Sequence, residues 1–342
     1  MDDWLSYHLY YHEDLSRAVL GFVHPAVSSL LSAGWIDRFF FVRYGLGGPH
    51  VRLRLRPLPG HAPLIDRAVH GSAEVFLSRS PSTARLDPEA LQRQTQAMLA
   101  GDPHETDATV YPDNTLVAAA FRPEVQRYGG PNLLPVSVDF FTVSSAAAID
   151  FLVRSGAEPR SQQLILALRL LLAQALCFAI DEEELLALLG YGVESWGEAV
   201  PTILAKGDRV YAAQPDAFRG IFRQEISDQL AEGSPDNPGE ALGEAARLLS
   251  QAVDLGDRPT RKRIGVSQLH MTATRLGLGN LEEVYISRLL SAAAVALLED
   301  DPEARALLRE ALARPARSPS LEDLLPRVLA ALPPRGAIDS AA

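Results

Sequence analysis

Residues 39–57, FFFVRYGLGGPHVRLRLRP, contain the pattern that decides the fold of the N-terminal part of this chain. An apolar run is followed by a turn rich in glycine, and then by a stretch in which basic and aliphatic residues alternate. A period of two is typical of a β-strand with two different faces. The segment therefore predicts a β-hairpin whose second strand carries all its basic side chains on one face. These are His50, Arg52, Arg54 and Arg56.

The segments around the hairpin predict an α+β fold. Residues 4–11 have the aromatic content of a strand, and residues 16–34 and 60–80 carry apolar residues at helical spacing. A strand, a helix and then a hairpin indicate an antiparallel sheet with helices on one face. Strong helix formers dominate from about residue 160. We therefore expect an N-terminal antiparallel sheet with flanking helices, followed by a mainly helical C-terminal half.

The domain organisation that we expect is a single catalytic domain over residues 1–335. Its α+β sub-region covers residues 1–158 and its helical sub-region covers residues 159–335. Residues 336–342 are small and polar, which predicts a disordered tail.

Composition excludes several classes of function. The 342-residue chain has a formal net charge of −11, which argues against general affinity for nucleic acid or an anionic membrane. Its single cysteine, Cys177, cannot form a disulfide within one chain. The N-terminus lacks a secretion signal, and the apolar window 164–180 is short for a membrane span and contains Arg169. We expect a cytoplasmic protein without a membrane partner.

The basic strand face has two readings from the residues alone. Arg52, Arg54 and Arg56 could be the solvated side of a half-exposed sheet, where ion pairs stabilise by less than about 1 kcal/mol each. Alternatively they form a site for an anion or a carbonyl, because guanidinium groups present several donors in a fixed geometry. The glycine turn beside them would let a substrate backbone approach closely.

A second polar cluster lies in residues 121–131, FRPEVQRYGGP. Glu124 and Arg127 are three residues apart, so that on a helical turn they could form an ion pair that fixes one guanidinium. Arg122 and Tyr128 lie beside them. The alternative is a plain turn after a helix.

A third cluster lies in residues 261–280, RKRIGVSQLHMTATRLGLGN. Helical spacing places Ser267, His270 and Thr274 along one stripe, with Arg275 beside it. A single histidine on a helix is more often a structural residue than a catalyst. The basic run Arg261, Lys262 and Arg263 is typical of a solvated loop.

The segment that follows predicts another helix. Asn280 and Glu283 have the spacing of a capping box. Tyr285 would then share a buried stripe with Leu281 and Leu289, either as a core residue or as a phenol of a site. We find no Walker loop, no dinucleotide fingerprint and no HExxH zinc motif, and we expect neither a metal nor a cofactor.

Together the three clusters resemble the C-terminal domain of lantibiotic dehydratases, a domain that also occurs as a stand-alone protein in thiopeptide biosynthesis. The motifs are WIDRFFFVRYGLGGPHVRLRLRP, FRPEVQRYGGP and SQLHMTATRLG, in that order, and the resemblance covers roughly residues 3–300. One departure concerns the usual HMxxNR motif, in which Thr274 occupies the asparagine position here.

The resemblance implies one of two reactions. Dehydratase domains eliminate glutamate from glutamylated Ser or Thr, whereas thiopeptide pyridine synthases join two dehydroalanines in a formal [4+2] aza-cycloaddition and then lose water and the leader peptide. The departure at Thr274 favours the pyridine synthase. A non-catalytic subunit that only presents the leader peptide is the third alternative.

The resemblance also implies roles for residues. His270 and Ser267 would act as the acid/base pair, Tyr285 as a second donor, and Arg52 and Arg54 as donors to a carbonyl or carboxylate. The implied partner is a precursor peptide with an acidic leader and a thiazole/dehydroalanine core. A homodimer and contacts with other pathway enzymes stay open. The other residues expected to contact substrate are His50, Glu124, Arg127, Tyr128, Thr274, Arg275, Arg261 and Arg263.

Overall fold

The computed structural model of the protein describes residues 4–101, 105–231 and 237–334. The chain divides into two compact units. The first runs to Glu124 and includes the segment from Leu332, and the second spans Val125–Ala331. The predicted tail, residues 336–342, lies outside the described residues.

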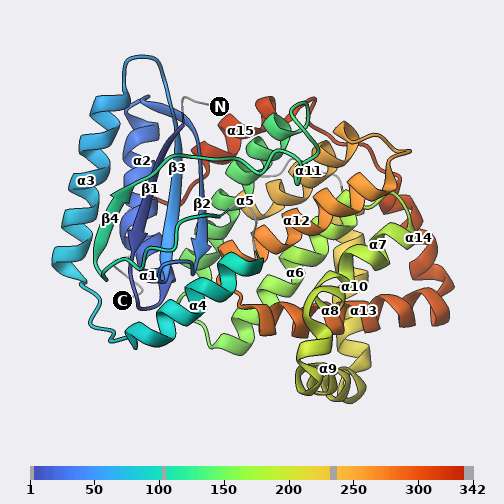
Figure 1. Cartoon of the computed structure of the whole chain (residues 1–342). Coiled ribbons are helices and arrows are strands. Elements are labelled where there is room, and N and C mark those ends of the chain that lie inside the picture. Colours follow the sequence, from blue (N-terminus) through green and yellow to red (C-terminus); the bar gives the residue numbers. More distant parts are fainter. Residues whose placement is uncertain (1–3, 102–104, 232–236, 335–342) are drawn as a thin grey trace. The chain divides into compact units, whose positions relative to one another are not determined.

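The first unit contains a four-stranded antiparallel sheet (Figure 1). Its strands are β1 (Leu5–Tyr10), β2 (Ile36–Tyr44), β3 (His50–Pro57) and β4 (Thr115–Ala118), in the spatial order β2-β3-β1-β4. The predicted hairpin is confirmed as β2 and β3. Gly47 and Gly48 in its turn have φ angles of 74° and 122°, a region that favours glycine. A Cβ atom at Gly48 would also lie 2.8 Å from Nε2 of His12.

Helices cover one face of this sheet, as expected. They are α1 (Leu15–Ala18), the π-helical η1 (Val19–Val23), α2 (His24–Ser32) and α3 (Ala62–Arg79). Helix α4 (Pro88–Gly101) instead lies at the β2–β3 turn, where Thr95 accepts the Gly47 backbone N–H at 3.2 Å. Strands and helices alternate as β-α-β-β-α-β. The covered face buries Tyr7, Leu9 and Leu53, and the Tyr7 hydroxyl donates to Asp66 of α3 at 3.0 Å. The face with the basic side chains is therefore the opposite one.

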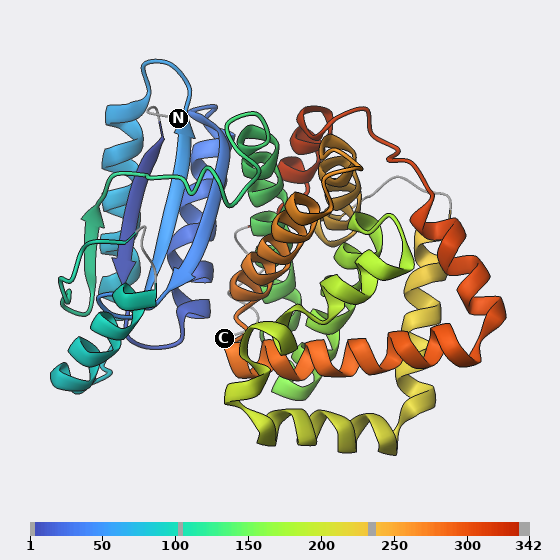
Figure 2. The same ribbon diagram turned by 45° about the vertical axis from the view of Figure 1, so that its right-hand side comes forward.

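The second unit is built of helices in its described residues (Figure 2). They are α5 (Leu134–Ser155), α6 (Arg160–Phe178), α7 (Glu182–Leu189), α8 (Tyr191–Trp196), the 3-10 helix η2 (Gly197–Ala199), α9 (Pro201–Ala213), α10 (Pro215–Leu230), α11 (Pro238–Ala252), α12 (Arg258–Leu276), α13 (Asn280–Asp300), α14 (Pro302–Leu312) and α15 (Leu321–Ala330).

Helix α5 is the central helix of this unit and packs against α11, α12 and α15. We placed the change to helical character near residue 159, whereas the units divide at Glu124 and Val125 because α5 packs with the helices that follow it. Helices α5 and α6 are long and apolar enough to span a membrane, but 83% of the apolar window of α5 is buried. Such burial is typical of a core helix in a globular protein.

Candidate functional site

The predicted stripe on α12 is confirmed, since Ser267, His270 and Thr274 all lie on this helix. Thr274 donates its hydroxyl to the His270 backbone carbonyl at 2.9 Å, which satisfies it within the helix. Ser267 and His270 keep contacts to side chains of other segments. The chemistry of this stripe therefore centres on His270 and Ser267.

His270 is held by a buried carboxylate. Its Nδ1 atom lies 2.9 Å from Oε2 of Glu283 on α13. A carboxylate accepts hydrogen bonds, so this contact places the ring proton on Nδ1 and leaves Nε2 with a lone pair. The Trp196 ring packs against the imidazole, with 5.3 Å between ring centroids. The histidine side chain is 26% exposed, and its ring can therefore exchange a proton with a bound molecule.

Glu283 serves two donors at once. Its Oε2 atom also accepts the Tyr191 hydroxyl at 2.9 Å, while its side chain is only 1% exposed. Burial, together with the adjacent carboxylate, raises the pKa of Tyr191 well above its usual value, so the phenol stays a donor. Tyr191, Glu283 and His270 thus form a hydrogen-bonded chain from the helical core to a partly exposed imidazole.

Ser267 receives a hydrogen bond from the second cluster. Nε of Arg127 donates to Oγ of Ser267 at 3.1 Å, so that the serine hydroxyl proton is available to another acceptor. The Arg127 guanidinium lies 5.7 Å from the centroid of the Tyr128 ring, which is itself buried against Phe141. Glu124 is the last residue of the first unit, and its predicted pairing with Arg127 stays a prediction.

Arg275 lies on the buried side of α12. Its side chain is fully buried, and its guanidinium lies 5.0 Å from the centroid of the Phe141 ring. Burial lowers the pKa of Arg275 to about 10, although the nearby Tyr128 acts in the opposite direction. Arg275 is thus a buried cation beside aromatic rings of the helical unit.

Tyr285 is half-buried on α13, and Nζ of Lys206 on α9 lies 5.3 Å from its ring centroid. Burial raises its pKa, so the phenol is a donor at neutral pH. The predicted buried stripe is wrong at Leu281, which is 53% exposed. The predicted capping box is also one residue out of register: Gly279 is the N-cap, and its N–H donates to Glu282 at 3.1 Å. This shift releases Glu283 to bind His270.

The predicted loop at residues 261–263 is wrong, because these residues belong to α12. Arg261 is fully buried and binds both oxygens of Glu184 at 2.9 and 3.1 Å. It also donates to the Ser250 and Phe178 carbonyls at 2.9 and 3.2 Å. Arg261 joins helix ends inside the unit and has no surface for a leader peptide, whereas Arg263 is exposed.

In the first unit, the basic face of β3 holds a neutral histidine. Nε of Arg52 donates to Nε2 of His50 at 3.1 Å, so Nδ1 carries the proton and donates to the Gly48 carbonyl at 2.8 Å. Burial and, after it, Arg52 lower the pKa of His50 to about 3. The Arg52 guanidinium also binds Glu105 at 2.6 Å and lies 3.9 Å from the Tyr44 ring centroid.

Arg54 differs from its neighbours because it has no carboxylate partner among the described residues. It is 7% exposed, and its Nη1 atom is buried without a hydrogen-bond partner. Burial, and then Arg52, lower its pKa to about 9. Ser6 lies directly across from Arg54 on β1, and its hydroxyl is buried without a hydrogen-bond partner. His8 lies across from Arg52, and its Nε2 atom is likewise buried without a partner. Three polar groups on one face can therefore still bind a ligand.

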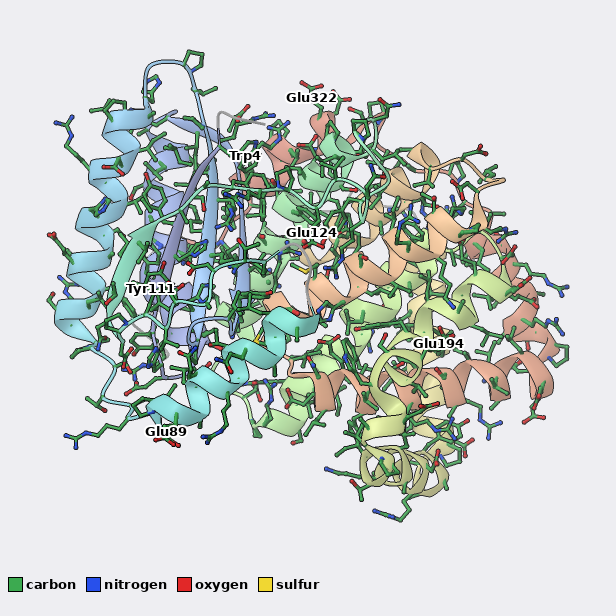
Figure 3. The ribbon with its side chains drawn as sticks, in the orientation of Figure 1. Trp4, Glu89, Tyr111, Glu124, Glu194 and Glu322 are labelled. Carbon is green, nitrogen blue, oxygen red and sulfur yellow. The ribbon has the colours of Figure 1, made fainter. Side chains whose placement is uncertain are left out.

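Aromatic rings lie beside these polar groups. The Phe121 ring centroid lies 5.4 Å from the Arg54 guanidinium and 5.7 Å from Phe40, and Trp4 packs on both rings. Figure 3 shows Trp4 at the start of β1 and Tyr111, which stacks on Tyr10 at 4.5 Å. The polar groups thus lie in a setting of low polarity, where a hydrogen bond to a carbonyl or carboxylate is stronger than in water.

Sequence reasoning missed Glu283, Tyr191 and Trp196 as parts of the site. Glu283 is 13 positions from His270, a separation that helical periodicity does not connect. The available signal is the Gly277–Gly279 turn, where Gly277 adopts a φ of 87° as the C-cap of α12. Among the described residues, no group of three or more His, Cys, Asp or Glu side chains is arranged to hold a metal ion.

Three solved structures share this architecture. The pyridine synthase TbtD from thiomuracin biosynthesis aligns with a TM-score of 0.70 and 19% identity, covering 86% of this chain and 98% of that chain. TsrL aligns with a TM-score of 0.56 and 16% identity, covering 91% and 99%. The tRNA-dependent lantibiotic dehydratase MibB from Microbispora sp. 107891 aligns with a TM-score of 0.51 and 19% identity, covering 85% of this chain and 28% of that chain.

These three likenesses establish the shared fold. No curated protein sequence matches the chain significantly. The sequence itself matches a family over residues 4–295, a range that includes the hairpin, the α12 stripe and Glu283. The chain therefore belongs to the family described as the lantibiotic biosynthesis dehydratase C-terminal domain.

Proposed function

We propose that this protein forms the central pyridine of a thiopeptide by joining two dehydroalanines of a modified precursor peptide. The observation that carries the proposal is the hydrogen-bonded chain Tyr191–Glu283–His270, which ends at a partly exposed imidazole. The reaction needs a group that can both take and return a proton at neutral pH, and a histidine oriented by a carboxylate is suited to this task. The shared fold with the pyridine synthase TbtD, which aligns over 98% of its own length, also supports the proposal.

In the first step, one backbone amide becomes its iminol tautomer. His270 Nε2 takes the amide N–H proton, and the carbonyl oxygen receives a proton from a donor such as Ser267 or Tyr285. Arg127 binds Ser267 Oγ and thereby orients its hydroxyl. The iminol and its dehydroalanine alkene form a two-azadiene, and the second dehydroalanine supplies the other alkene carbons.

The ring then closes by two new bonds and becomes aromatic by two eliminations. The hydroxyl that came from the amide oxygen leaves as water, with a ring proton taken by the base. The leader peptide leaves as a carboxamide, and the second proton lost completes the pyridine. Holding both alkenes of one peptide close together could remove about 7 to 11 kcal/mol of the barrier as orientation entropy.

Glutamate elimination is the second candidate, and Arg54 is a suitable residue to bind its substrate. A buried guanidinium with an unused Nη1 suits a glutamyl carboxylate, and the flanking Ser6 hydroxyl could complete the contact. The same group could instead polarise a peptide carbonyl during cycloaddition. Arg54 therefore supports binding of an acyl or carboxylate group without selecting the reaction.

Mass spectrometry with purified protein separates the two reactions. A thiazole-containing peptide with two dehydroalanines and an intact leader should yield a leader carboxamide and a core that is lighter by leader plus water. The His270→Ala variant should lose this activity by about 10²- to 10⁴-fold. Release of free glutamate from a glutamylated peptide, with the dehydroalanine substrate untouched, would instead establish elimination. Leader binding without a product from either peptide would contradict both reactions, and unchanged product formation by the His270→Ala protein would contradict the role proposed for His270.

A further inference from the structure

The helical unit contains a cavity that the proposed function does not use. It has a volume of about 630 Å³ and lies among α5, α6, α10, α11 and the segment after α14. This volume is in the range of small-molecule binding sites. None of Ser267, His270, Glu283 and Tyr285 lines it.

The wall formed by α5 and α6 is largely apolar. It contributes Ala147, Phe151, Leu166, Leu170 and Ala173. Such a wall can cover the hydrocarbon or aromatic body of a ligand, and each buried methylene stabilises binding by up to about 0.8 kcal/mol. Charged groups lie among these apolar side chains, Asp150 on α5 and Arg169 on α6, and α10 and α11 contribute others, so that the cavity can cover both an apolar body and a charged group.

The arginines around the cavity are committed elsewhere or extend to solvent. Arg247 donates to the Ala311 and Arg314 carbonyls, and Arg314 and Arg317 donate to carbonyls at the end of α10. The side chains of Arg154 and Arg169 are 63% and 36% exposed. These cations hold the surrounding segments together, and the cavity does not bury an unpaired arginine among its described lining residues.

Two carboxylates, by contrast, are buried and only half used. Asp150 on α5 and Glu225 on α10 are each 6% exposed. Oδ1 of Asp150 binds Arg154 at 2.8 Å, and Oε1 of Glu225 pairs with Arg169 at 2.7 Å. The second oxygen of each has no hydrogen bond from a described residue. Burial raises the pKa of both groups, that of Glu225 to about 7, which indicates incomplete charge compensation.

We propose that this cavity is a binding site for an organic cation, a primary ammonium or guanidinium group carried on an apolar body. The cationic group binds the free oxygens of Asp150 and Glu225, and the apolar body packs against α5 and α6. Asp228 and Glu244 line the same cavity. Both oxygens of Asp228 are used, by Gln224 and Arg169, and Oε1 of Glu244 accepts the backbone N–H groups of Arg317 and Ser318. The site is independent of the proposed reaction.

Ligand-observed NMR on the full chain tests the proposal with matched probes. Phenethylammonium, phenethyl alcohol and phenylacetate share one ring and differ in charge. The blocked dipeptide acetyl-Phe-Arg-amide is the fourth probe, and it tests whether the ligand is a peptide with a basic side chain rather than a small free amine. We expect saturable binding of at least one cationic probe and binding of neither the alcohol nor the anion. Equal binding of all three phenethyl compounds, or of none of the four probes, would overturn the proposal.

Variants locate the site independently of activity. Asp150→Asn and Glu225→Gln should each weaken the bound cation about ten- to hundredfold. Ala173→Phe fills the cavity while both carboxylates remain, and it should abolish binding. Glu89→Gln changes an exposed carboxylate on α4 (Figure 3) and should have no effect. Melting curves confirm that each variant is folded, and cation binding retained in Ala173→Phe would place the site elsewhere and refute the assignment.

Discussion

Glu283 on α13 fixes the proton on Nδ1 of His270 on α12 through a contact of 2.9 Å, although the carboxylate is almost completely buried and the imidazole is not. The reactive nitrogen of the pair therefore points away from the carboxylate. A buried acceptor of this kind orients the ring and fixes its tautomer. Glu283 is a positioning residue for the proposed acid/base group.

Replacing Glu283 with Gln should reduce kcat of pyridine formation by about 10- to 100-fold with little change in KM, because the substrate does not contact this carboxylate. Glu282→Gln is the matched control, since its neighbouring carboxylate binds the exposed Arg160 instead. Steady-state kinetics on both variants measure kcat and KM separately. An effect on KM alone, or equal losses in both variants, would contradict a positioning role.

Arg54→Met should abolish substrate processing while leaving the fold as stable or more stable. The guanidinium is buried without a carboxylate partner, and removing an uncompensated buried charge relieves a desolvation cost. Arg56→Met is the control, because Arg56 forms a surface pair with Asp37 at 2.7 Å. Thermal melting and turnover are measured together. A large fall in Tm for Arg54→Met would show that the charge is structural.

Arg261→Met should destabilise the protein by about 3 to 5 kcal/mol, since it leaves the buried Glu184 carboxylate without its partner. Arg263→Met, on the same helix, should change stability by no more than about 0.5 kcal/mol because this side chain is exposed. Urea denaturation provides both free energies. The burial of Arg261 argues against contact with substrate. If the Arg261→Met protein were fully stable but no longer bound the leader peptide, Arg261 would be a substrate contact after all.

The neutral state of His50 predicts acid sensitivity. Its pKa is about 3 in the folded protein and about 6.5 in an unfolded chain, so unfolding takes up a proton between these values. The free energy of unfolding should therefore fall as pH decreases below about 6.5, by up to about 1.4 kcal/mol per pH unit from this group. The His50→Asn variant should show a shallower dependence between pH 6 and pH 4.5. Parallel curves for the two proteins would exclude His50 as the source.

Gly265→Ala should destabilise the protein by about 1 to 3 kcal/mol, because a Cβ atom there would lie 2.6 Å from Cδ2 of Leu188 and 2.9 Å from the Phe178 ring. Gly220→Ala in α10 meets no atom within 4 Å and should stabilise by about 0.4 to 1 kcal/mol. Denaturation of both variants tests the difference. Equal effects would mean that α12 can shift to accommodate the methyl group.

The alternation of the hairpin and the spacing of the later helices could be predicted because each is a local pattern. Helix α5 was missed, since its β-branched and serine residues lower helix propensity and its helicity depends on burial from several sides. The basic run at Arg261 was interpreted as a loop because three consecutive cations are typical of a solvated segment, and the buried partners of Arg261 come from other segments of the fold. The Ser267–His270 stripe could be predicted, but its partners Arg127 and Glu283 come from other segments of the fold.

Helix α12 carries its anchoring residues and its partly buried polar residues on different sides. Arg261 and Gly265 anchor it among its neighbours, whereas His270 and Thr274, on the opposite side, are only partly buried. Mutation of the second group should change the surface that we propose for substrate binding, without disturbing the contacts that hold the helix. A directed-evolution library limited to positions 270 and 274 should therefore retain a large folded fraction, and the family could acquire new reactions on one scaffold by the same route.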